Sequence, residues 1–235
     1  MPTGEKTGAK AKGRAAVSVA LKVAQVREEV RNRIQQGALL PGERINELAL
    51  TQELQIGRAM LREALRSLEQ AGLVRIIKNR GAEVCKLGLE DALHLYDIRA
   101  GLARASGRLI AARITAAEER MLTGLQERME AMVRERDVSH YHDLNESFHR
   151  HLMLAAKNPR LQALNQDVED ELKLYLRKGV YTLAQIQLSI AEHRAILDAV
   201  VQGQPEQAAE AFEKHILTGK QRMLDTISVA AIQAA

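Results

Sequence analysis

The chain has 235 residues, and its 46 % hydrophobic and 27 % charged residues exclude whole-chain disorder and allow one large domain or two small ones. Its one cysteine, Cys85, excludes an intrachain disulfide and a cysteine-based zinc site and favours a reducing, cytoplasmic setting. The net charge of +4 divides unevenly: residues 1–87 carry 16 Lys/Arg against 9 Asp/Glu, or +7, and residues 88–235 carry 18 against 21, or −3. This asymmetry indicates a basic nucleic-acid module followed by a second domain.

The chain starts with a polar segment. Residues 1–15 are rich in Lys, Gly and Ala and show no apolar period, so we expect a flexible basic tail, with an arm that tracks DNA as the alternative. The segment lacks the apolar stretch of a secretory signal, and no apolar run in the chain approaches the ~18–20 residues of a membrane span. We therefore expect no membrane partner.

The first periodic segment follows this tail. Apolar residues recur at spacings of three and four from Val23 to Ile34, which predicts an amphipathic helix over residues 17–36. Gly37 closes it.

Two further helices are predicted before the first strand. Asn46 is placed to cap a short helix that runs to about residue 54. A third helix is expected over residues 58–70, where Gly72 stops it. Its inner face consists of apolar residues at helical spacing, namely Leu61, Ala64, Leu65 and Leu68.

The segment after the third helix is the one part of the sequence that is typical of strands. Residues 74–77 and 82–85 flank the turn residues 78–81, which predicts a β-hairpin. Three short helices followed by a hairpin form the plan of a winged helix-turn-helix, which we assign to residues 16–87.

Basic residues on the third helix and at the hairpin tip are the candidates for DNA contact. Arg58, Arg62 and Arg66 are spaced by four residues and lie along one side of the helix, where a guanidinium can bind phosphate or pair with guanine. The exposed N-terminus of the helix favours phosphate. A recognition helix usually presents its N-terminal residues to base edges, so Arg58 and Arg62 are the stronger candidates. At the tip, Arg80 can enter a minor groove and Gly81 lets the backbone approach a partner closely.

The remainder of the chain is predicted to be helical. Proline and glycine residues divide it into about six helices, which we place at residues 90–114, 116–136, 138–156, 159–177, 182–202 and 205–228. The fold class is therefore mainly α, with a winged helix-turn-helix ahead of an all-helical domain over residues 88–230.

Histidines on three separate helices are the candidate metal ligands. His149, His193 and His215 each follow the apolar face of their helix, and Asn145 precedes His149 by one turn. Three imidazoles suit a divalent ion such as Zn, Ni or Mn, and the amide oxygen would add a fourth ligand. His142 and Glu146 on the same helix are rival ligands, and three hydrogen-bonded core histidines are the alternative.

The winged segment resembles the DNA-binding domain of the GntR family of bacterial transcription regulators. The resemblance covers residues 26–87 and is carried by "GALLPGERI", "LREALRSLEQAGLV" and "NRGAEV". The family usually opens its recognition helix with Ser-Arg-Thr-Pro, and this chain has Gly57, Arg58, Ala59 and Met60 there. The arginine is kept, but two hydroxyl donors to phosphate are absent.

The helical remainder resembles the FCD effector-binding domain of the FadR-like GntR subgroup, through "NESFHRHLMLAAKNPRL" and "EHRAILDAVVQGQPEQAAEAFEKHI". The resemblance implies a divalent metal held by Asn145, His149, His193 and His215. It also implies a small organic-acid effector. Asn in place of the more usual Asp leaves the metal with more uncompensated charge to attract an anion.

Two arginines are the candidate anchors of that effector. Arg99 is the only charge on an otherwise apolar strip of its helix, so it either faces a ligand anion or is paired with an acidic neighbour. The subgroup often has an arginine there and a glutamate four residues later, where this chain has Ala103. Arg177 is the second candidate.

The sequence thus predicts a homodimeric regulator that binds a short palindrome in double-stranded DNA under the control of a small carboxylate. One alternative is a DNA-binding protein with a metal-free structural dimerisation domain. Another is a helical metalloenzyme, which the single Glu-x-x-His pair and the absence of other catalytic motifs disfavour. The sequence does not name the effector or the operator.

Overall fold

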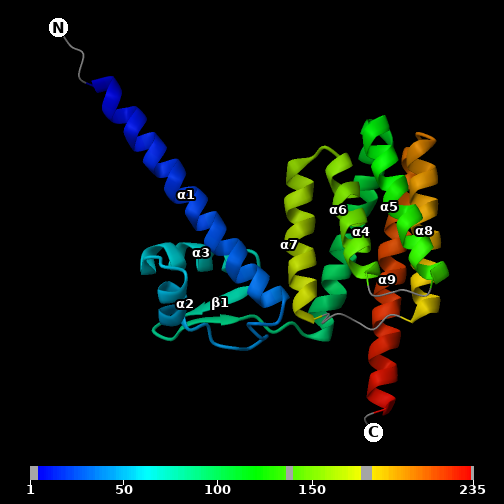
Figure 1. Ribbon diagram of the computed structural model, residues 1–235. Coiled ribbons are helices and arrows are strands. Elements are labelled where there is room, and N and C mark those ends of the chain that lie inside the picture. Colours follow the sequence, from blue (N-terminus) through cyan, green and yellow to red (C-terminus); the bar gives the residue numbers. More distant parts are fainter. Residues whose placement is uncertain (1–4, 136–139, 176–181, 234–235) are drawn as a thin grey trace. The chain divides into compact units, whose positions relative to one another are not determined.

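The computed structural model describes the backbone of residues 5–135, 140–175 and 182–233, and the side-chain surroundings of residues 20–135, 140–174 and 182–227 (Figure 1). Contacts divide the chain into two units. Unit 1 comprises Met1–Gly88 and Asp170–Tyr175, and unit 2 comprises Leu89–Glu169 and Leu176–Ala235. The mainly helical fold class is confirmed, with a helix-turn-helix and a two-stranded hairpin ahead of an all-helical region.

Unit 1 begins with a helix longer than the sequence predicted. Helix α1 spans Glu5–Gln35, whereas we expected a helix over residues 17–36 after a flexible tail. The helix thus continues through residues 5–15, which we had assigned to the tail. Ala, Lys and Arg have high helix propensities and continue a helix without an apolar period.

The next two helices form the helix-turn-helix. Helix α2 spans Glu47–Glu53, and the side chain of Asn46 caps it by accepting from the backbone N–H of Ala49 at 3.0 Å. Helix α3 spans Arg58–Gln70 and starts at Gly57, which provides no side-chain cap.

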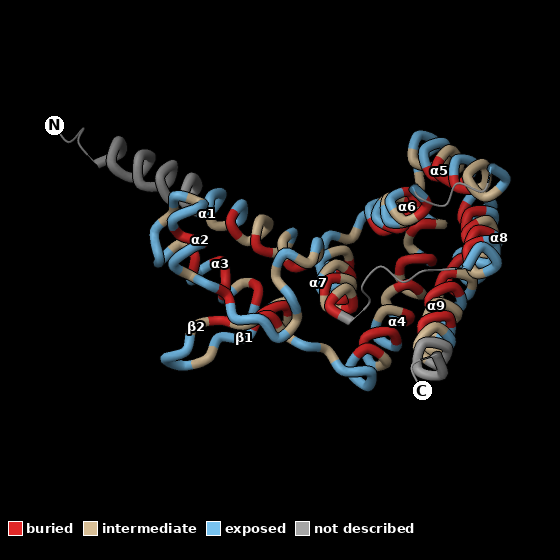
Figure 2. Tube along the Cα trace, turned by 60° about the horizontal axis from the view of Figure 1, so that its bottom comes forward, coloured by how far each residue is buried: buried red, intermediate tan, exposed pale blue. Residues whose placement is uncertain are grey.

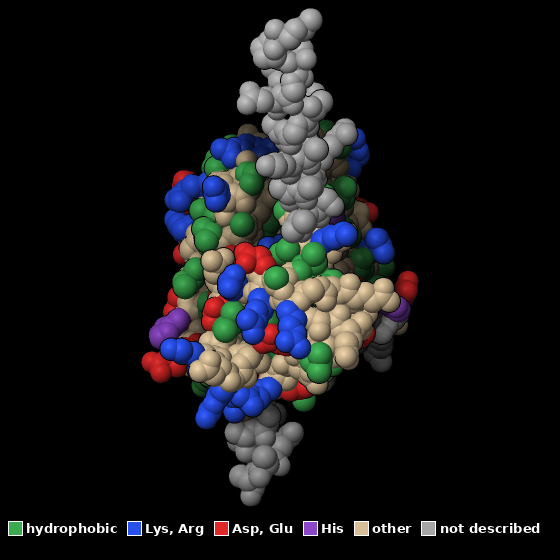
Figure 3. Space-filling model, turned by 90° about the vertical axis from the view of Figure 1, so that its left-hand side faces the viewer, with side chains coloured by type: hydrophobic (Ala, Val, Ile, Leu, Met, Phe, Trp, Pro, Cys, Tyr) green, Lys and Arg blue, Asp and Glu red, His purple; other side chains and the backbone are tan. Residues whose placement is uncertain are grey.

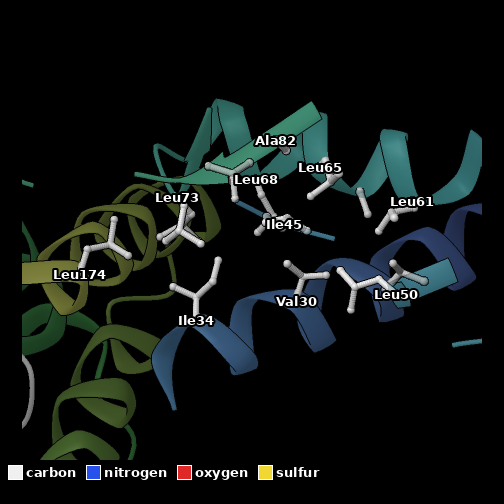
Figure 4. Close-up of a cluster of buried hydrophobic side chains, with 14 residues drawn as sticks. Val30, Ile34, Ile45, Leu50, Leu61, Leu65, Leu68, Leu73, Ala82 and Leu174 are labelled. Carbon is white, nitrogen blue, oxygen red and sulfur yellow. The ribbon is translucent and has the colours of Figure 1, made fainter. Parts of the chain in front are cut away.

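The core of unit 1 lies between α1 and α3 (Figure 4). Val30 and Ile34 of α1 face Leu61, Leu65 and Leu68 of α3, and all of these side chains are buried. Leu174, from the part of α7 that belongs to unit 1, joins the same cluster. Removing one such leucine side chain costs about 2–5 kcal/mol of stability, so this core fixes how α3 is held.

The hairpin consists of β1 (Val74–Ile77) and β2 (Gly81–Val84) in antiparallel register, with Val74 opposite Val84 and Ile77 opposite Gly81. The second strand starts one residue before the predicted one. The segment ahead of α2 also pairs with β2, because the N–H of Ile45 donates to the carbonyl of Ala82 at 2.8 Å.

Unit 2 is built from helices whose bounds follow the prolines and glycines of the sequence. They are α4 (Leu89–Arg113), α5 (Ala116–Glu135), α6 (Tyr141–Ala155), the first part of α7 (Pro159–Tyr175), α8 (Leu183–Val201) and α9 (Pro205–Gln233). Each lies within about three residues of the predicted range, apart from α9, which ends five residues later. Figure 2 shows their buried faces.

Close packing of α4 on α9 supports the centre of unit 2. A Cβ atom at Gly107 would lie 2.5 Å from the carbonyl oxygen of Ala208, so only glycine lets the two backbones approach this far. Helices α6, α8 and α9 then each contribute a histidine to the interior. Among the described residues, no helix combines the length and apolarity needed to cross a membrane.

Candidate functional site

The three predicted histidines lie together inside unit 2. His149 of α6, His193 of α8 and His215 of α9 are all buried, and one ring nitrogen from each falls within 4.8 Å of the others. The Nε2 atoms of His149 and His215 are 3.2 Å apart. Among the residues that the structure describes, this is the one group of three His, Cys, Asp or Glu side chains with such spacing.

Several ring nitrogens of this cluster have no partner in the protein. Both nitrogens of His193 and Nδ1 of His149 are buried without a hydrogen bond. A buried polar atom without a partner costs about 1–3 kcal/mol, so two core histidines of this kind are hard to explain by packing alone. A metal ion would bind one nitrogen of each ring and so remove part of this cost, and the donor set fits one.

Burial keeps the imidazoles neutral. It lowers the pKa of His149 well below the ordinary value, and His215 and His193 lower it further. Burial lowers the pKa of His193 in the same way, with a smaller contribution from His215. The pKa of His215 is also lowered by burial, although its hydrogen bond to Glu192 opposes this. Neutral imidazoles are the form that binds metal.

Two residues that the sequence analysis missed support the cluster. Glu192 accepts a hydrogen bond from Nδ1 of His215 at 2.8 Å and is paired with Nη1 of Arg222 at 3.0 Å. Burial alone would raise the pKa of Glu192, but the bonds from His215 and Arg222 outweigh it and lower that pKa. A carboxylate behind a histidine fixes the tautomer that directs Nε2 to a metal.

A signal for one of the missed residues was present in the sequence, since Arg222 follows His215 by seven residues, or two helical turns on the same face.

A cavity of about 90 Å³ opens beside the histidines. His149, His215 and Asn145 line it, together with Arg99 and Arg222. Asn145 is half-buried, and its Oδ1 accepts a hydrogen bond from the Tyr141 hydroxyl at 3.3 Å. The predicted fourth ligand therefore shares the cavity with two of the histidines, while His193 lies deeper.

Arg99 lines the same cavity and is already paired. Its Nη2 donates to Glu169 of α7 at 2.8 Å, whereas its buried Nε has no hydrogen-bond partner. The sequence analysis offered a ligand-facing arginine or one with an acidic partner. In the structure Arg99 lines a cavity and also has an acidic partner. The second predicted anchor, Arg177, lies outside the described residues.

The rival ligands on α6 do not join the cluster. Glu146 is exposed and His142 is half-buried, and neither lines the cavity. Another histidine of α6, His151, has its Nδ1 2.7 Å from the carbonyl oxygen of Ser147.

The predicted DNA-contacting arginines of unit 1 are exposed on α3. Arg58 has an exposed side chain at the start of the helix. Arg62 is 67 % exposed, with its Nε 3.6 Å from Glu47, and Arg66 is 64 % exposed and paired with Glu63. Figure 3 shows one face of the molecule on which Lys and Arg side chains alternate with acidic ones.

The hairpin tip carries the remaining candidates. Arg80 is exposed, and its carbonyl oxygen accepts a hydrogen bond from Nη2 of Arg44 at 3.1 Å. Gly81 has a φ of 80°, a conformation that favours glycine, and a Cβ there would lie 3.1 Å from Oε1 of Glu47. The tip and the second helix are therefore closely fitted.

Comparisons with known proteins agree with this architecture. The profile of the gntR family of bacterial regulatory proteins matches residues 22–84, and that of the FCD domain matches residues 94–218. The HTH-type transcriptional regulator YdhC of Bacillus subtilis is 28 % identical over 82 % of this chain and 85 % of its own length. A protein of Paenarthrobacter nicotinovorans, named as a probable D-xylose utilization operon transcriptional repressor, is 29 % identical over 82 % of this chain and 84 % of its own length.

Solved structures show the same fold. Escherichia coli McbR/YncC has a TM-score of 0.70 at 18 % identity and covers 91 % of this chain and 99 % of its own. A GntR regulator from Rhodococcus sp. RHA1 has a TM-score of 0.66 at 21 % identity, over 86 % and 97 % of the two chains. Because the FCD match alone spans more than half of the chain and the gntR match covers the winged unit, the chain belongs to the GntR family of DNA-binding transcription regulators and carries an FCD domain.

Proposed function

We propose that this regulator binds a divalent metal and a small carboxylate in unit 2, and that the carboxylate modulates operator binding by unit 1. The observation that carries the proposal is the buried cluster of His149, His193 and His215, whose ring nitrogens in part lack partners and which borders a cavity with two arginines. The matched families are families of regulators, which argues against an enzyme.

The metal would be held by the three histidines and, through its amide oxygen, by Asn145. Zn, Ni and Mn are all compatible with this donor set. When bound, the ion supplies a positive charge with open positions for an anion. Glu192 would keep His215 in the metal-binding tautomer through the bond to its Nδ1.

The size and charge of the cavity define the effector class. The cavity volume of about 90 Å³ accommodates a small acid. Arg99 offers an N–H group without a partner toward an anion. The second guanidinium, from Arg222, is held on Glu192 and adds positive charge.

In unit 1, α3 would read the major groove with Arg58 and Arg62, and Arg66 would contact phosphate. Arg80 and Gly81 would place the hairpin tip against the adjacent groove. A homodimer would bind a short palindrome, since operator symmetry mirrors protein symmetry. Such a protein acts in the cytoplasm, and its single cysteine accords with that setting.

The test starts from a DNA duplex that the zinc-loaded wild-type chain selects from a random-sequence pool. Affinity for this duplex is then measured by fluorescence anisotropy with and without a panel of small carboxylates, including acetate, lactate and succinate. We expect at least one of them to change the affinity about 5–150-fold, the usual size of coupling between two sites. Arg99→Gln should abolish this response.

Arg104→Gln is the matched control, because Arg104 lies on the same helix and is paired with Glu213 away from the cavity. It should respond to the carboxylate as the wild type does. A duplex affinity that no carboxylate changes, in zinc-loaded and chelated protein alike, would contradict the proposal.

A further inference from the structure

Two consecutive residues of α7 are held by different units. Glu169 belongs to unit 2 and is paired with Arg99, which lines the cavity. Asp170 belongs to unit 1 and bonds to two residues of α1. One peptide bond thus joins a residue at the candidate effector site to a residue that supports the DNA-binding unit.

Glu169 occupies the place on Arg99 that an acidic ligand would take. Its Oε1 lies 2.8 Å from Nη2 of Arg99, and both side chains are about four-fifths buried, at 21 % and 18 % exposed. The Nε of Arg99 remains without a partner. Arginine binds a carboxylate best through two parallel N–H bonds, so this single-bonded pair leaves the guanidinium open to a better-fitting anion.

Asp170 is anchored more firmly. Its side chain is 1 % exposed, with Oδ2 2.8 Å from Nη1 of Arg31 and Oδ1 2.7 Å from Nε2 of Gln35. Four residues later, Leu174 is buried in the core of unit 1. A Cβ on Gly72 would lie 2.5 Å from the Glu171 side chain, so this end of α7 fits closely against the turn that follows α3.

We propose that Glu169 is an internal substitute for the effector's carboxylate, and that its displacement from Arg99 loosens the last turns of α7 and, through Asp170, the end of α1. This inference rests on the proposed function and names the regulation of the same site. Since α1 packs on α3, the loosening reaches the helix that carries Arg58 and Arg62.

The argument follows from competition for one guanidinium. An entering carboxylate that bonds to both Nε and Nη2 of Arg99 would crowd Glu169 at Nη2 and repel its negative charge, so each weakens the binding of the other by the same factor. This end of α7 then loses the polar attachment that Glu169 makes to Arg99. Backbone amides from Glu169 to Leu174 should open more often, because local opening depends on such contacts.

Hydrogen–deuterium exchange on the full-length, zinc-loaded chain tests this with acetate as the probe. In the wild type, acetate should speed exchange in residues 169–174 and in the last turn of α1, residues 31–35. Glu169→Gln should show this faster exchange without acetate, by about tenfold. It should also bind acetate about tenfold more tightly, because the competitor is weakened.

Two further variants separate the specific effect of the Glu169–Arg99 pair from a general disturbance of α7. Arg99→Gln breaks the same pair from its other side, so it should reproduce the faster exchange and lose acetate binding. Asp167→Asn, an exposed carboxylate two residues before Glu169, should behave as the wild type does.

The outcomes distinguish the inference from the proposed function. Unchanged exchange and unchanged acetate affinity in Glu169→Gln would overturn the inference, as would an equal effect of Asp167→Asn. Faster exchange in both Glu169→Gln and Arg99→Gln, with no acetate binding by any variant, would support the role of the Glu169–Arg99 pair in holding α7 and count against a carboxylate effector. An acetate affinity that is lost in Arg99→Gln but unchanged in Glu169→Gln would support the proposed function and refute the role of Glu169 as a competitor.

Discussion

The two candidate sites of this protein differ in where their polar groups lie. On α3 of unit 1, arginines stand exposed on a helix whose other face is a continuous apolar core. In unit 2, histidines from three helices are buried within the core itself. The exposed arginines are solvated in the free protein, whereas Nδ1 of His149 and both nitrogens of His193 are buried without a hydrogen-bond partner.

This difference teaches how each site is coupled to stability. A solvated arginine costs little in the free protein and gains its role only when DNA arrives. A buried imidazole without a partner costs stability until something binds it. Substitutions of the exposed arginines on α3 should therefore change DNA binding alone, while substitutions in the histidine cluster should change both ligand binding and unfolding.

The largest effect is expected for His193→Ala. Structural zinc sites gain about 10–16 kcal/mol from their ligands together, so loss of one of four should weaken Zn²⁺ binding at least about 100-fold. Competition with a chromophoric chelator measures this. His151→Ala is the matched control, because His151 lies on α6 with its Nδ1 bonded to the Ser147 carbonyl. The zinc affinity of this variant should equal that of the wild type. Equal affinity in the two variants would remove His193 from the site.

The next effect is a loss of stability in acid for the chelated protein. Burial holds the folded-state pKa of His149 and His193 well below the ordinary value of 6.5, and His215 lowers both further. Below pH 6.5 the unfolded chain therefore takes up protons that the folded chain does not. The stability from these neutral histidines is complete above pH 6.5 and falls by at most about 1.4 kcal/mol per pH unit for each of them.

Urea unfolding at pH 7.5, 6.5 and 5.5 measures this slope. In His193→Gln the slope should be shallower, because one neutral histidine is gone. A free energy of unfolding that is flat between pH 7.5 and 5.5 would show that the imidazoles are not held neutral.

A smaller effect is expected on the DNA side. Arg58→Ala should weaken binding to the selected duplex about tenfold, since a contact to a base or phosphate contributes about 1–3 kcal/mol. Its melting temperature should stay unchanged, because the side chain is exposed. Arg128→Ala, an exposed arginine on α5 of unit 2, is the control and should alter neither quantity. A fall in melting temperature for Arg58→Ala would break the contrast between the two sites.

The smallest effect is a gain. Gly57 starts α3 with a φ of −76° and a ψ of 150° and no side-chain cap, and a Cβ there would meet nothing within 4 Å. Gly57→Ser should raise the free energy of unfolding by a few tenths of a kcal/mol, because a hydroxyl can cap the helix. Chemical denaturation measures it, with Gly57→Ala as the control that adds a Cβ but no hydroxyl to cap the helix. A destabilised Gly57→Ser would contradict this account of the helix start.

Local chemistry predicted most of the fold. Apolar spacing placed α3, and prolines and glycines placed the ends of most helices in unit 2, since these residues act on the backbone where they stand. The same reasoning did not extend the first helix over residues 5–15, where helix propensity extends α1 without an apolar face to reveal it. It also missed the pairing of the Ile45 segment with β2, which joins residues far apart in the sequence.

The site was predicted in part for the same reason. The histidines were recognisable from their position on apolar faces, because helical periodicity is local. The partner of Arg99 was not, since Glu169 lies 70 residues away on another helix. The role of Glu192 was hidden for a different reason: its bond reaches His215 on α9 rather than its neighbour His193.

Native mass spectrometry of the full-length chain tests the central claim most directly, if the protein is prepared without chelators or a metal-affinity step and offered Zn, Ni and Mn in turn. The account predicts about one metal ion per chain, held in the wild type and in His151→Ala and lost in both His149→Ala and His193→Ala. A wild-type chain that takes up none of the three metals, or a His149→Ala/His193→Ala double variant that retains one, would contradict it.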